Sequence, residues 1–384
     1  MKPNVLGFVG EALNLVRKSD LAGATDVIRK ALSGEEARSR AGVPEVRPHR
    51  PTARVGTPGI RRSLGETLRV LRVQPSFPPA APVVPLAEPP NEFDQRFVRR
   101  TYRGPAGSLS YRLYLPVDHG RRKLALVLML HGCAQDPEDF ALGTQMNALA
   151  DEFDLVVAYP HQPRGANASG CWNWFDRRHQ NRGSGEPAKL AGLAQALAKE
   201  FGVANERVFA AGLSAGGAMA EVLAATYPDV FEAVGVHSGL PYRSAADVPS
   251  AFAAMKGNTA VGPAPPRAVD RRCRKIIIHG GADGTVHPAN GERILDEAER
   301  GQARLKRIDL DWESQSGRVR RTALEDDKGR TVVERWLVEG GGHAWFGGDS
   351  RGSFTQTAGL DASRVMVRFF LDGEDRPDSL RQLR

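Results

Sequence analysis

The chain has 384 residues, of which 41% are hydrophobic and 26% are charged, and it carries a formal net charge of +8. These proportions are typical of a globular protein, and the length suffices for one large domain with extra segments or for two domains. No apolar run reaches the ~20 residues that a bilayer-spanning helix needs, so the sequence predicts no transmembrane segment.

The positive charge is concentrated in one segment. Residues 1–37 hold five basic and five acidic side chains, whereas residues 38–72 hold nine arginines and two glutamates, which leaves a surplus of +7 there. A solvated basic linker is the simplest interpretation. Nucleic-acid binding is disfavoured because the segment lacks the interleaved aromatic residues that stack on bases. Contact with an anionic surface or an acidic partner stays open.

The N-terminal part of the chain predicts two segments. Apolar residues at helical spacing predict a helical hairpin over residues 1–34, which is too small to be stable alone. Residues 35–92 form a basic, Pro-rich linker, with seven prolines between Gln74 and Pro90, and we expect it to be disordered. Glu11 interrupts the first apolar stretch and no clear cleavage site follows, so we expect a cytoplasmic protein.

Residues 93–384 predict an α/β domain. Continuously apolar runs, typical of strands covered on both faces, alternate with helical patterns, which predicts a mostly parallel sheet with helices on both faces. The expected strands cover 108–116, 124–132, 155–160, 207–212, 231–239 and 275–281. The expected helices lie near 186–201, 216–226, 244–255, 288–300 and 361–371. A hairpin that turns at Lys328–Gly329 adds a last strand.

The segment GLSAG, residues 212–216, lies between an expected buried strand and an expected helix. It fits the pattern G-x-S-x-G, in which a serine occupies a sharp and strained turn and the glycines remove Cβ atoms that would collide. Such a turn exposes the serine hydroxyl above the sheet, at the start of the helix. We therefore predict that Ser214 is a nucleophile.

A serine hydroxyl needs a base, and the base needs a carboxylate that fixes its tautomer. His343 is the best-placed histidine, because three glycines precede it on a loop after the last strand. Asp283 follows a buried strand, whereas its rival Asp270 precedes that strand and Asp296 lies within a helix. The chain order serine, aspartate, histidine is that of an α/β-hydrolase.

The tetrahedral intermediate of acyl transfer needs two preorganised N–H donors, the oxyanion hole. The backbone of Ala215, directly after the nucleophile, is one candidate. The loop after the strand 124–132 supplies the other, the backbone N–H of Cys133, and Gly132 lets that loop bend.

The three cysteines predict no metal site and no disulfide framework. They are Cys133, Cys171 and Cys273, an odd number, and no two of them have the spacing of metal ligands. From the spacing alone, one pair could still be bridged.

Five separated motifs together resemble the esterase family that includes the polyhydroxybutyrate depolymerases, to which some feruloyl and acetylxylan esterases are related. The motifs are LHGCAQDPEDF, GCWNWFD, GLSAGGAMA, HGGADGTVHPANG and GGGHAW, within residues 95–372. The resemblance implies an α/β-hydrolase fold and a serine esterase without a cofactor. Its nucleophile, acid and base fall on Ser214, Asp283 and His343, and its oxyanion amides fall on Cys133 and Ala215.

The resemblance also concerns the cysteines and the aromatic residues near them. It implies that Cys133 and Cys171 lie close together and could be bridged, a bond that a reducing cytoplasm would not favour. Many family members are extracellular, which is the alternative location. Four aromatic residues are candidates to line the substrate groove: His131, Trp172, Trp174 and Trp345. For Trp172 and Trp174, a place in the core is the alternative.

Three functions stay open at this point. The first is hydrolysis of hydroxybutyrate oligomers or other short-chain esters through an acyl-enzyme. The second, within the same class, is a feruloyl- or acetylxylan-type carbohydrate esterase. The third is a protein that mainly binds a granule or a partner through residues 1–92.

Overall fold

The computed structural model of the protein describes residues 95–117, 119–120, 123–258, 273–301, 304–314 and 317–372. They belong to the second of the two units into which the chain divides, Leu86–Arg384. The predicted helical hairpin over 1–34 and the predicted linker over 35–92 lie outside the described residues and stay predictions. In the described part, no helix is long and apolar enough to cross a membrane.

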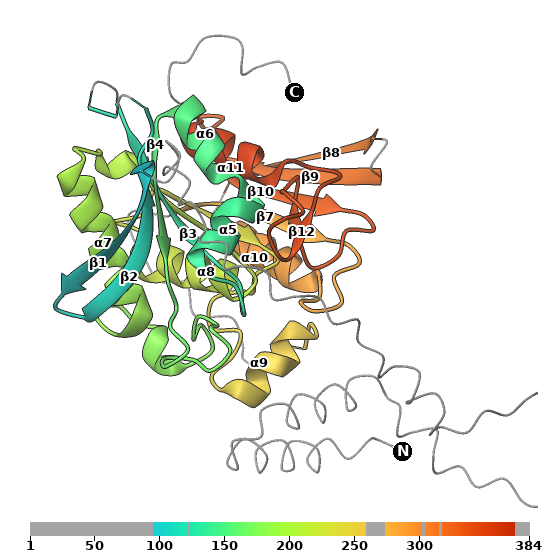
Figure 1. The fold of residues 1–384 in the computed structure, drawn as a ribbon. Coiled ribbons are helices and arrows are strands. Elements are labelled where there is room, and N and C mark those ends of the chain that lie inside the picture. Colours follow the sequence, from blue (N-terminus) through green and yellow to red (C-terminus); the bar gives the residue numbers. More distant parts are fainter. Residues whose placement is uncertain are drawn as a thin grey trace, which may run out of the picture. The chain divides into compact units, whose positions relative to one another are not determined.

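A ten-stranded sheet in the order β1-β2-β4-β3-β5-β6-β7-β10-β9-β8 forms the centre of this unit (Figure 1). The strands from β4 to β10 in that order pair in parallel, and the pairs at both edges are antiparallel. The central strands are β3 (Ala125–Leu130), β4 (Leu155–Pro160), β5 (Val208–Leu213), β6 (Ala233–His237), β7 (Arg274–Gly280) and β10 (Thr331–Val338). The edge strands are β1 (Phe97–Gly104), β2 (Gly107–Tyr114), β8 (Lys306–Ser314) and β9 (Gly317–Glu325).

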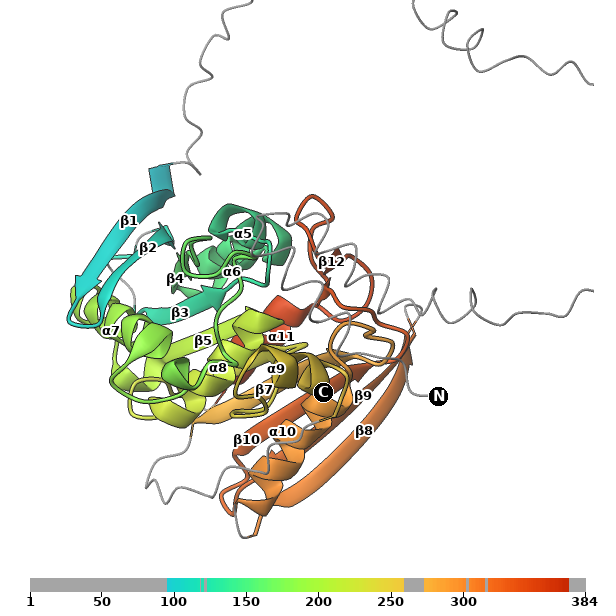
Figure 2. The ribbon, with the colours of Figure 1, turned by 90° about the horizontal axis from the view of Figure 1, so that it is seen from below.

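Helices cover both faces of the sheet, because its central strands are apolar on both sides. Figure 2 shows α7 and α8 on one side of the strands and α5 and α6 on the other. One core cluster lies under α7 (Gly185–Glu200), α8 (Ala215–Thr226) and α10 (Ala289–Arg300). The opposite cluster lies under α5 (Pro137–Thr144), α6 (Met146–Phe153) and α11 (Ala362–Leu371). The remaining elements are α9 (Val248–Met255), two 3₁₀ turns (Arg177–His179 and Asn205–Arg207) and the short pair β11 (Trp345–Phe346) and β12 (Thr355–Gln356).

The predicted α/β-hydrolase architecture is confirmed. Each predicted strand and helix from residue 108 onwards has a counterpart within a few residues. Three parts of the fold were not predicted from the sequence: the edge strand β1, the helix pair α5 and α6, and the edge strand β8. Strand β1 shows no regular alternation of apolar and charged residues. Strand β8 does alternate, with Ile308, Leu310 and Trp312 at every second position, so its signal was present in the sequence and was overlooked. Helix α5 is eight residues long and begins at Pro137, after the capping residue Asp136.

The parallel register aligns four strand ends at one rim of the sheet. Leu130 of β3 pairs with Gly212 of β5, and Val338 of β10 pairs with Gly280 of β7. Strand β6 separates these two pairs and is hydrogen-bonded to both β5 and β7. The carboxyl ends of parallel strands are where α/β proteins place their ligand sites.

Candidate active site

Ser214 forms the turn between β5 and α8. Its backbone has φ 57° and ψ −116°, a conformation that a residue with a side chain rarely adopts. The flanking glycines make this turn possible. A Cβ at Gly212 would lie 2.4 Å from the carbonyl carbon of Gly216, and a Cβ at Gly216 would lie 2.0 Å from the oxygen of Leu130. The predicted strained serine turn is therefore present, packed directly against β3.

Asp283 and His343 meet at the same rim. Asp283 follows β7, His343 follows β10, and His343 Nδ1 lies 2.7 Å from Asp283 Oδ2. The other carboxylate oxygen, Oδ1, accepts hydrogen bonds from the N–H groups of Thr285 (2.9 Å) and Val286 (2.8 Å). With Nδ1 donating to the carboxylate, Nε2 of His343 is left as a proton acceptor.

The environment of Asp283 keeps it ionised. Burial opposes the charge of this carboxylate, but the hydrogen bond and charge of His343 and the N–H of Val286 outweigh burial, so the pKa of Asp283 lies below its ordinary value. The loops that carry the pair are joined by a hydrogen bond from the N–H of Ala282 to the oxygen of Gly341 (2.9 Å). A negative charge beside Nδ1 stabilises the imidazolium that forms when Nε2 takes a proton.

His237, at the end of β6, connects the serine turn to the histidine loop. Its backbone oxygen accepts a hydrogen bond from the N–H of Ser214 (2.9 Å). Its ring is fully buried, stacks on Trp345 at 4.9 Å and lies 3.3 Å from the backbone nitrogen of Phe346. The hydroxyl of Ser214 itself makes no hydrogen bond to His343 in this structure, although both residues are described. Such contacts are often long before substrate binds.

The loop after β3 packs against the serine turn. A Cβ at Gly132 would lie 3.7 Å from the Cβ of Ser214. The N–H of Gly132 donates to Gln135 Oε1 (2.9 Å), whereas among the described residues no hydrogen bond uses the N–H of Cys133. Ala215 is the first residue of α8, where N–H groups lack acceptors within the helix. Two unused N–H groups thus flank the serine.

A disulfide joins Cys133 to Cys171, the pair that the family resemblance implied. Their Cα atoms are 4.3 Å apart, and they are 38 residues apart in the sequence. Next to the bridge, the N–H of Ala134 donates to the oxygen of Ser169 (2.9 Å). The two links attach the loop after β3 to the loop after β4. Cys273 is buried and belongs to no disulfide.

The four residues predicted to line a substrate groove are all buried, with exposed fractions of 6% or less. His131 donates from Nδ1 to the oxygen of Gly132 (2.8 Å) and accepts at Nε2 from the N–H of Gln162 (3.2 Å). Trp174 and Trp345 pack into the two core clusters. His131, Trp174 and Trp345 therefore pack beneath the loops of the site and do not face an open groove. Trp172 is buried too, but it also lines a cavity.

Sequence analysis missed the side chain of Gln135. It is 7% exposed, and besides holding Gly132 it donates from Nε2 to Asp139 Oδ2 and to the oxygen of Ser353, both at 3.0 Å. Gln135 thus clasps the loop after β3 to the segment between β11 and β12, which follows His343. The spacing of Gln135 and Asp139 across the start of α5 was readable in the sequence, but the partner 218 residues away was not.

Comparison with known proteins identifies the family. The model of the family described as "Esterase PHB depolymerase" matches residues 109–307, more than half of the chain. The chain belongs to this family. The match contains Ser214 and Asp283, whereas His343 lies beyond it.

Relatives of this chain are named for several kinds of ester. Poly(3-hydroxyalkanoate) depolymerase C of Paucimonas lemoignei is 31% identical over 57% of this chain and 54% of its own length. Feruloyl esterase B of Neurospora crassa is 30% identical over 46% of this chain and 64% of its own length. A probable acetylxylan esterase A of Aspergillus fumigatus is 28% identical over 48% of this chain and 53% of its own length. The chain thus spans only about half to two thirds of the length of these relatives.

The fold has a counterpart among solved structures. The acetyl xylan esterase from Aspergillus awamori superposes with a TM-score of 0.51 at 19% sequence identity, covering 64% of this chain and 94% of that one. At this identity the likeness supports the α/β-hydrolase fold alone.

Proposed function

We propose that this protein is a serine esterase that hydrolyses carboxylic esters through an acyl-enzyme. The observation that carries the proposal is the hydrogen-bonded pair of His343 and Asp283 at the rim where the strained turn of Ser214 presents its hydroxyl. Membership of an esterase family supports the proposed reaction. The roles are nucleophile for Ser214, base for His343 and orienting acid for Asp283.

The reaction proceeds in two halves. His343 Nε2 takes the proton of Ser214 while the serine oxygen attacks the ester carbonyl, and the imidazolium then gives that proton to the departing alcohol. In the second half His343 takes a proton from water, and the hydroxide attacks the acyl-enzyme. The bond between the acyl group and the serine oxygen then breaks, the imidazolium returns its proton to that oxygen, and the carboxylic acid leaves. In both halves the N–H groups of Cys133 and Ala215 donate to the oxyanion, a contribution of roughly 3 kcal/mol for each donor in comparable enzymes.

The substrates we propose are hydroxyalkanoate oligomers or other short-chain esters. The relative from Paucimonas lemoignei, named as a poly(3-hydroxyalkanoate) depolymerase, supports this class. The relatives named feruloyl and acetylxylan esterases support a carbohydrate esterase as the alternative. Hydrolysis of a 3-hydroxybutyrate trimer without hydrolysis of acetylated xylan or methyl ferulate would favour the first class, and the reverse would favour the second.

We also propose that the protein works in an oxidising compartment, as the family's extracellular members do. The Cys133–Cys171 disulfide supports this location over the cytoplasmic one expected from the N-terminus. Binding to a granule or partner through residues 1–92 lies outside the described residues and stays a prediction.

The decisive experiment compares the wild-type protein with Ser214→Ala on p-nitrophenyl butyrate. Removal of the nucleophile is expected to lower turnover on the order of a millionfold, while the thermal unfolding midpoint stays high. A Ser238→Ala variant, at the neighbouring strand end, is the matched control. Retention of more than a thousandth of wild-type turnover in Ser214→Ala would contradict the proposed mechanism.

A further inference from the structure

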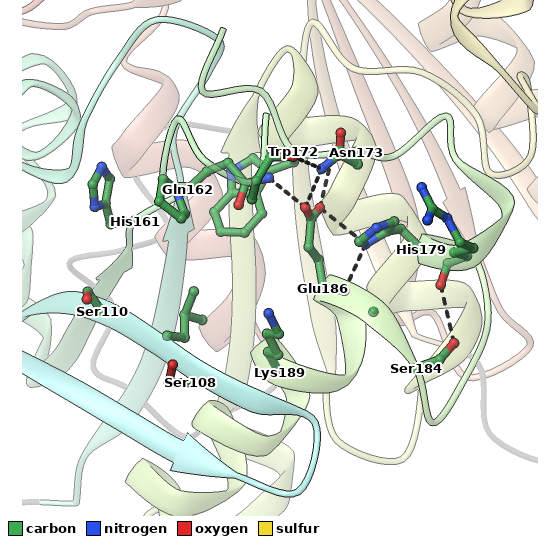
Figure 3. A pocket seen from close by; sticks show the side chains of 15 residues that line it. Ser108, Ser110, His161, Gln162, Trp172, Asn173, His179, Ser184, Glu186 and Lys189 are labelled. Atoms are coloured by element: carbon green, nitrogen blue, oxygen red, sulfur yellow. Dashed lines mark hydrogen bonds and ion pairs between the residues drawn. The ribbon is translucent and has the colours of Figure 1, made fainter. Parts of the chain in front are cut away.

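A cavity opens next to Trp172, in the loops that follow β4 (Figure 3). Its volume is about 760 Å³. Residues from β2, from the loops that follow β4 and from the first turn of α7 line it, and none of them belongs to the proposed triad. Trp172, the residue after the bridged Cys171, is part of its wall. The cavity thus lies on the far side of the loop to which the Cys133–Cys171 disulfide attaches the oxyanion loop.

The sheet register places the cavity on the catalytic rim. Across the sheet, Leu113 of β2 pairs with Ala158 of β4, Ala158 pairs with Leu128 of β3, and Leu128 pairs with Ala210 of β5. Because β2 runs antiparallel to these strands, its residues before Leu113 lie towards the same rim as Ser214. Three strand spacings separate β2 from β5, a distance of about 14 Å.

One side of the cavity is a closed hydrogen-bond network around the buried carboxylate of Glu186. Its Oε1 accepts from Gln162 Nε2 (2.5 Å) and Asn173 Nδ2 (2.6 Å), and its Oε2 accepts from the N–H of Asn173 (2.8 Å). Figure 3 shows these groups between His161 on one side and Ser184 on the other. With three donors on its two oxygens, the carboxylate of Glu186 links α7 to the loops that follow β4.

The side of the cavity formed by α7 offers a donor that is not used. Figure 3 shows Lys189 reaching from α7 towards the cavity. Among the described residues, the ammonium of Lys189 forms no ion pair or hydrogen bond. Ser108 and Ser110 alternate along β2 with Leu109, which packs in the core cluster under α7, so the two serine side chains lie on the other face of the strand. The other cation of the lining, Arg178, is paired with Asp176. An ammonium without a partner in the wall of a cavity is a group that binds an anion.

We propose that this cavity binds the free carboxylate of a hydroxyacyl oligomer, with Lys189 as the cation that recognises it. This inference rests on the proposed esterase function and specifies its substrate. An oligomer of hydroxy acids has one ester bond between neighbouring units and one carboxylate, at its acid end. The three strand spacings between β2 and β5, about 14 Å, set the scale of the separation between that carboxylate and the bond under attack, which is a few ester units.

The direction of cleavage follows from this placement. Attack by Ser214 retains the acyl part, which contains the hydroxyl end of the oligomer, on the serine. The part that leaves is an alcohol, and it is a shorter hydroxy acid whose carboxylate lies against Lys189. The cavity is therefore a leaving-group subsite. The enzyme releases short hydroxy acids of defined length from the acid end.

The test compares two substrates that differ only in charge: a 3-hydroxybutyrate tetramer with a free carboxylate and the methyl ester of the same tetramer. Wild-type protein is expected to have the lower KM for the free acid, by on the order of fivefold at low salt, the effect of one partly exposed charge pair. Lys189→Met is expected to abolish this preference and to leave the kcat for p-nitrophenyl butyrate unchanged. Lys199→Met, on the exposed last turn of the same helix, is the control and is expected to keep the preference.

The outcomes separate this inference from the proposed function. Equal KM values of the two tetramers in wild-type protein, or a preference that survives in Lys189→Met, would overturn the carboxylate subsite while p-nitrophenyl butyrate is still cleaved. Absence of any p-nitrophenyl butyrate hydrolysis by wild-type protein would overturn the esterase itself. A product assay adds a second readout: the wild-type enzyme should release one dominant short hydroxy acid, and Lys189→Met should release a broader mixture.

Discussion

The catalytic rim and the outer hairpin of β8 and β9 belong to the same sheet but are held together in different ways. At the rim, a few buried contacts each fix one group in place. They are the Asp283–His343 hydrogen bond, the Cys133–Cys171 bridge and the Gln135 clasp. The hairpin carries exposed ion pairs instead, such as those that Arg318 and Arg320 make with Asp311. Removing one partner from a buried contact leaves the other without a hydrogen bond or packing, so a single substitution has a large effect. Removing one partner from an exposed ion pair changes the free energy of unfolding little.

The sharpest test of this contrast is the substitution Asp283→Asn. An amide at this position preserves the shape but favours the wrong tautomer of His343, so kcat for p-nitrophenyl butyrate should fall by on the order of 10⁴-fold. Asp327→Asn, in the exposed turn of the β9–β10 hairpin, is the matched control and should be neutral. A loss of less than tenfold in Asp283→Asn would show that the rim does not work as a coupled unit.

Acid should weaken the rim before it affects the hairpin. Burial lowers the pKa of His131 and of His279 to about 4, so the folded protein binds fewer protons than the unfolded chain between about pH 6.5 and pH 4. The free energy of unfolding should therefore have its full value above about pH 6.5. Below that pH it should decrease by up to about 1.4 kcal/mol per pH unit for each histidine.

Urea unfolding at pH 7.5, 6 and 5 measures this slope. On the hairpin, hydrogen bonds from Thr322 and Arg307 outweigh burial and lower the pKa of Asp309, so that carboxylate stays charged over the same range. A His279→Asn variant should show a shallower slope than wild-type protein. A flat profile from pH 7.5 to pH 5 in wild-type protein would mean that the buried histidines titrate normally.

Loss of the disulfide should have the next largest effect on the free energy of unfolding. Cys171→Ser opens a loop of 38 residues, for which chain entropy predicts a loss of about 4 kcal/mol in the free energy of unfolding. Because the bridge positions the Cys133 N–H, kcat should fall as well. Cys273→Ala, which keeps the bridge, should remain as sensitive to reductant as wild-type protein, whereas reductant should have no further effect on Cys171→Ser. Equal stability of wild-type protein with and without reductant would argue against the bridge.

The smallest effect is expected at the hairpin. Asp311→Ala removes the partner of Arg318 and Arg320, yet the loss in the free energy of unfolding should stay below about 1 kcal/mol and vanish in high salt. Urea unfolding at low and high salt measures it. A salt-independent loss of about 2 kcal/mol or more would erase the contrast between the two regions.

The fold and the serine turn could be predicted from the sequence because the patterns that indicate them lie in consecutive residues. The strand β5, the glycines around Ser214 and the helix α8 are consecutive in the chain, so period and turn chemistry sufficed to predict the strained serine. Asp283 and His343 were selected by their places after strands, since parallel register brings strand ends together. The catalytic roles of all three residues stay predictions until the variants are measured.

Other contacts were out of reach because their partners are remote in the chain. Nothing near Gln135 indicates that its amide meets Ser353, and nothing near Trp345 indicates that its Nε1 donates to Ser363 instead of facing a substrate. The charged edge strands were missed for a different reason. In β1 the apolar and charged residues do not alternate regularly, whereas β8 shows the alternation typical of a strand with one solvated face and was overlooked.

The position of β6 has a consequence for how this protein can vary. Ser214 and the loop of Cys133 follow β5 and β3, while Asp283 and His343 follow β7 and β10, and His237 of β6 is hydrogen-bonded to both sides. Alignment of the two halves is thus set by one central strand and not by the chain that connects them. A change in β6 would therefore act on both pairs of groups at once, whereas a change in the loop after one of the other strands would act on one pair alone.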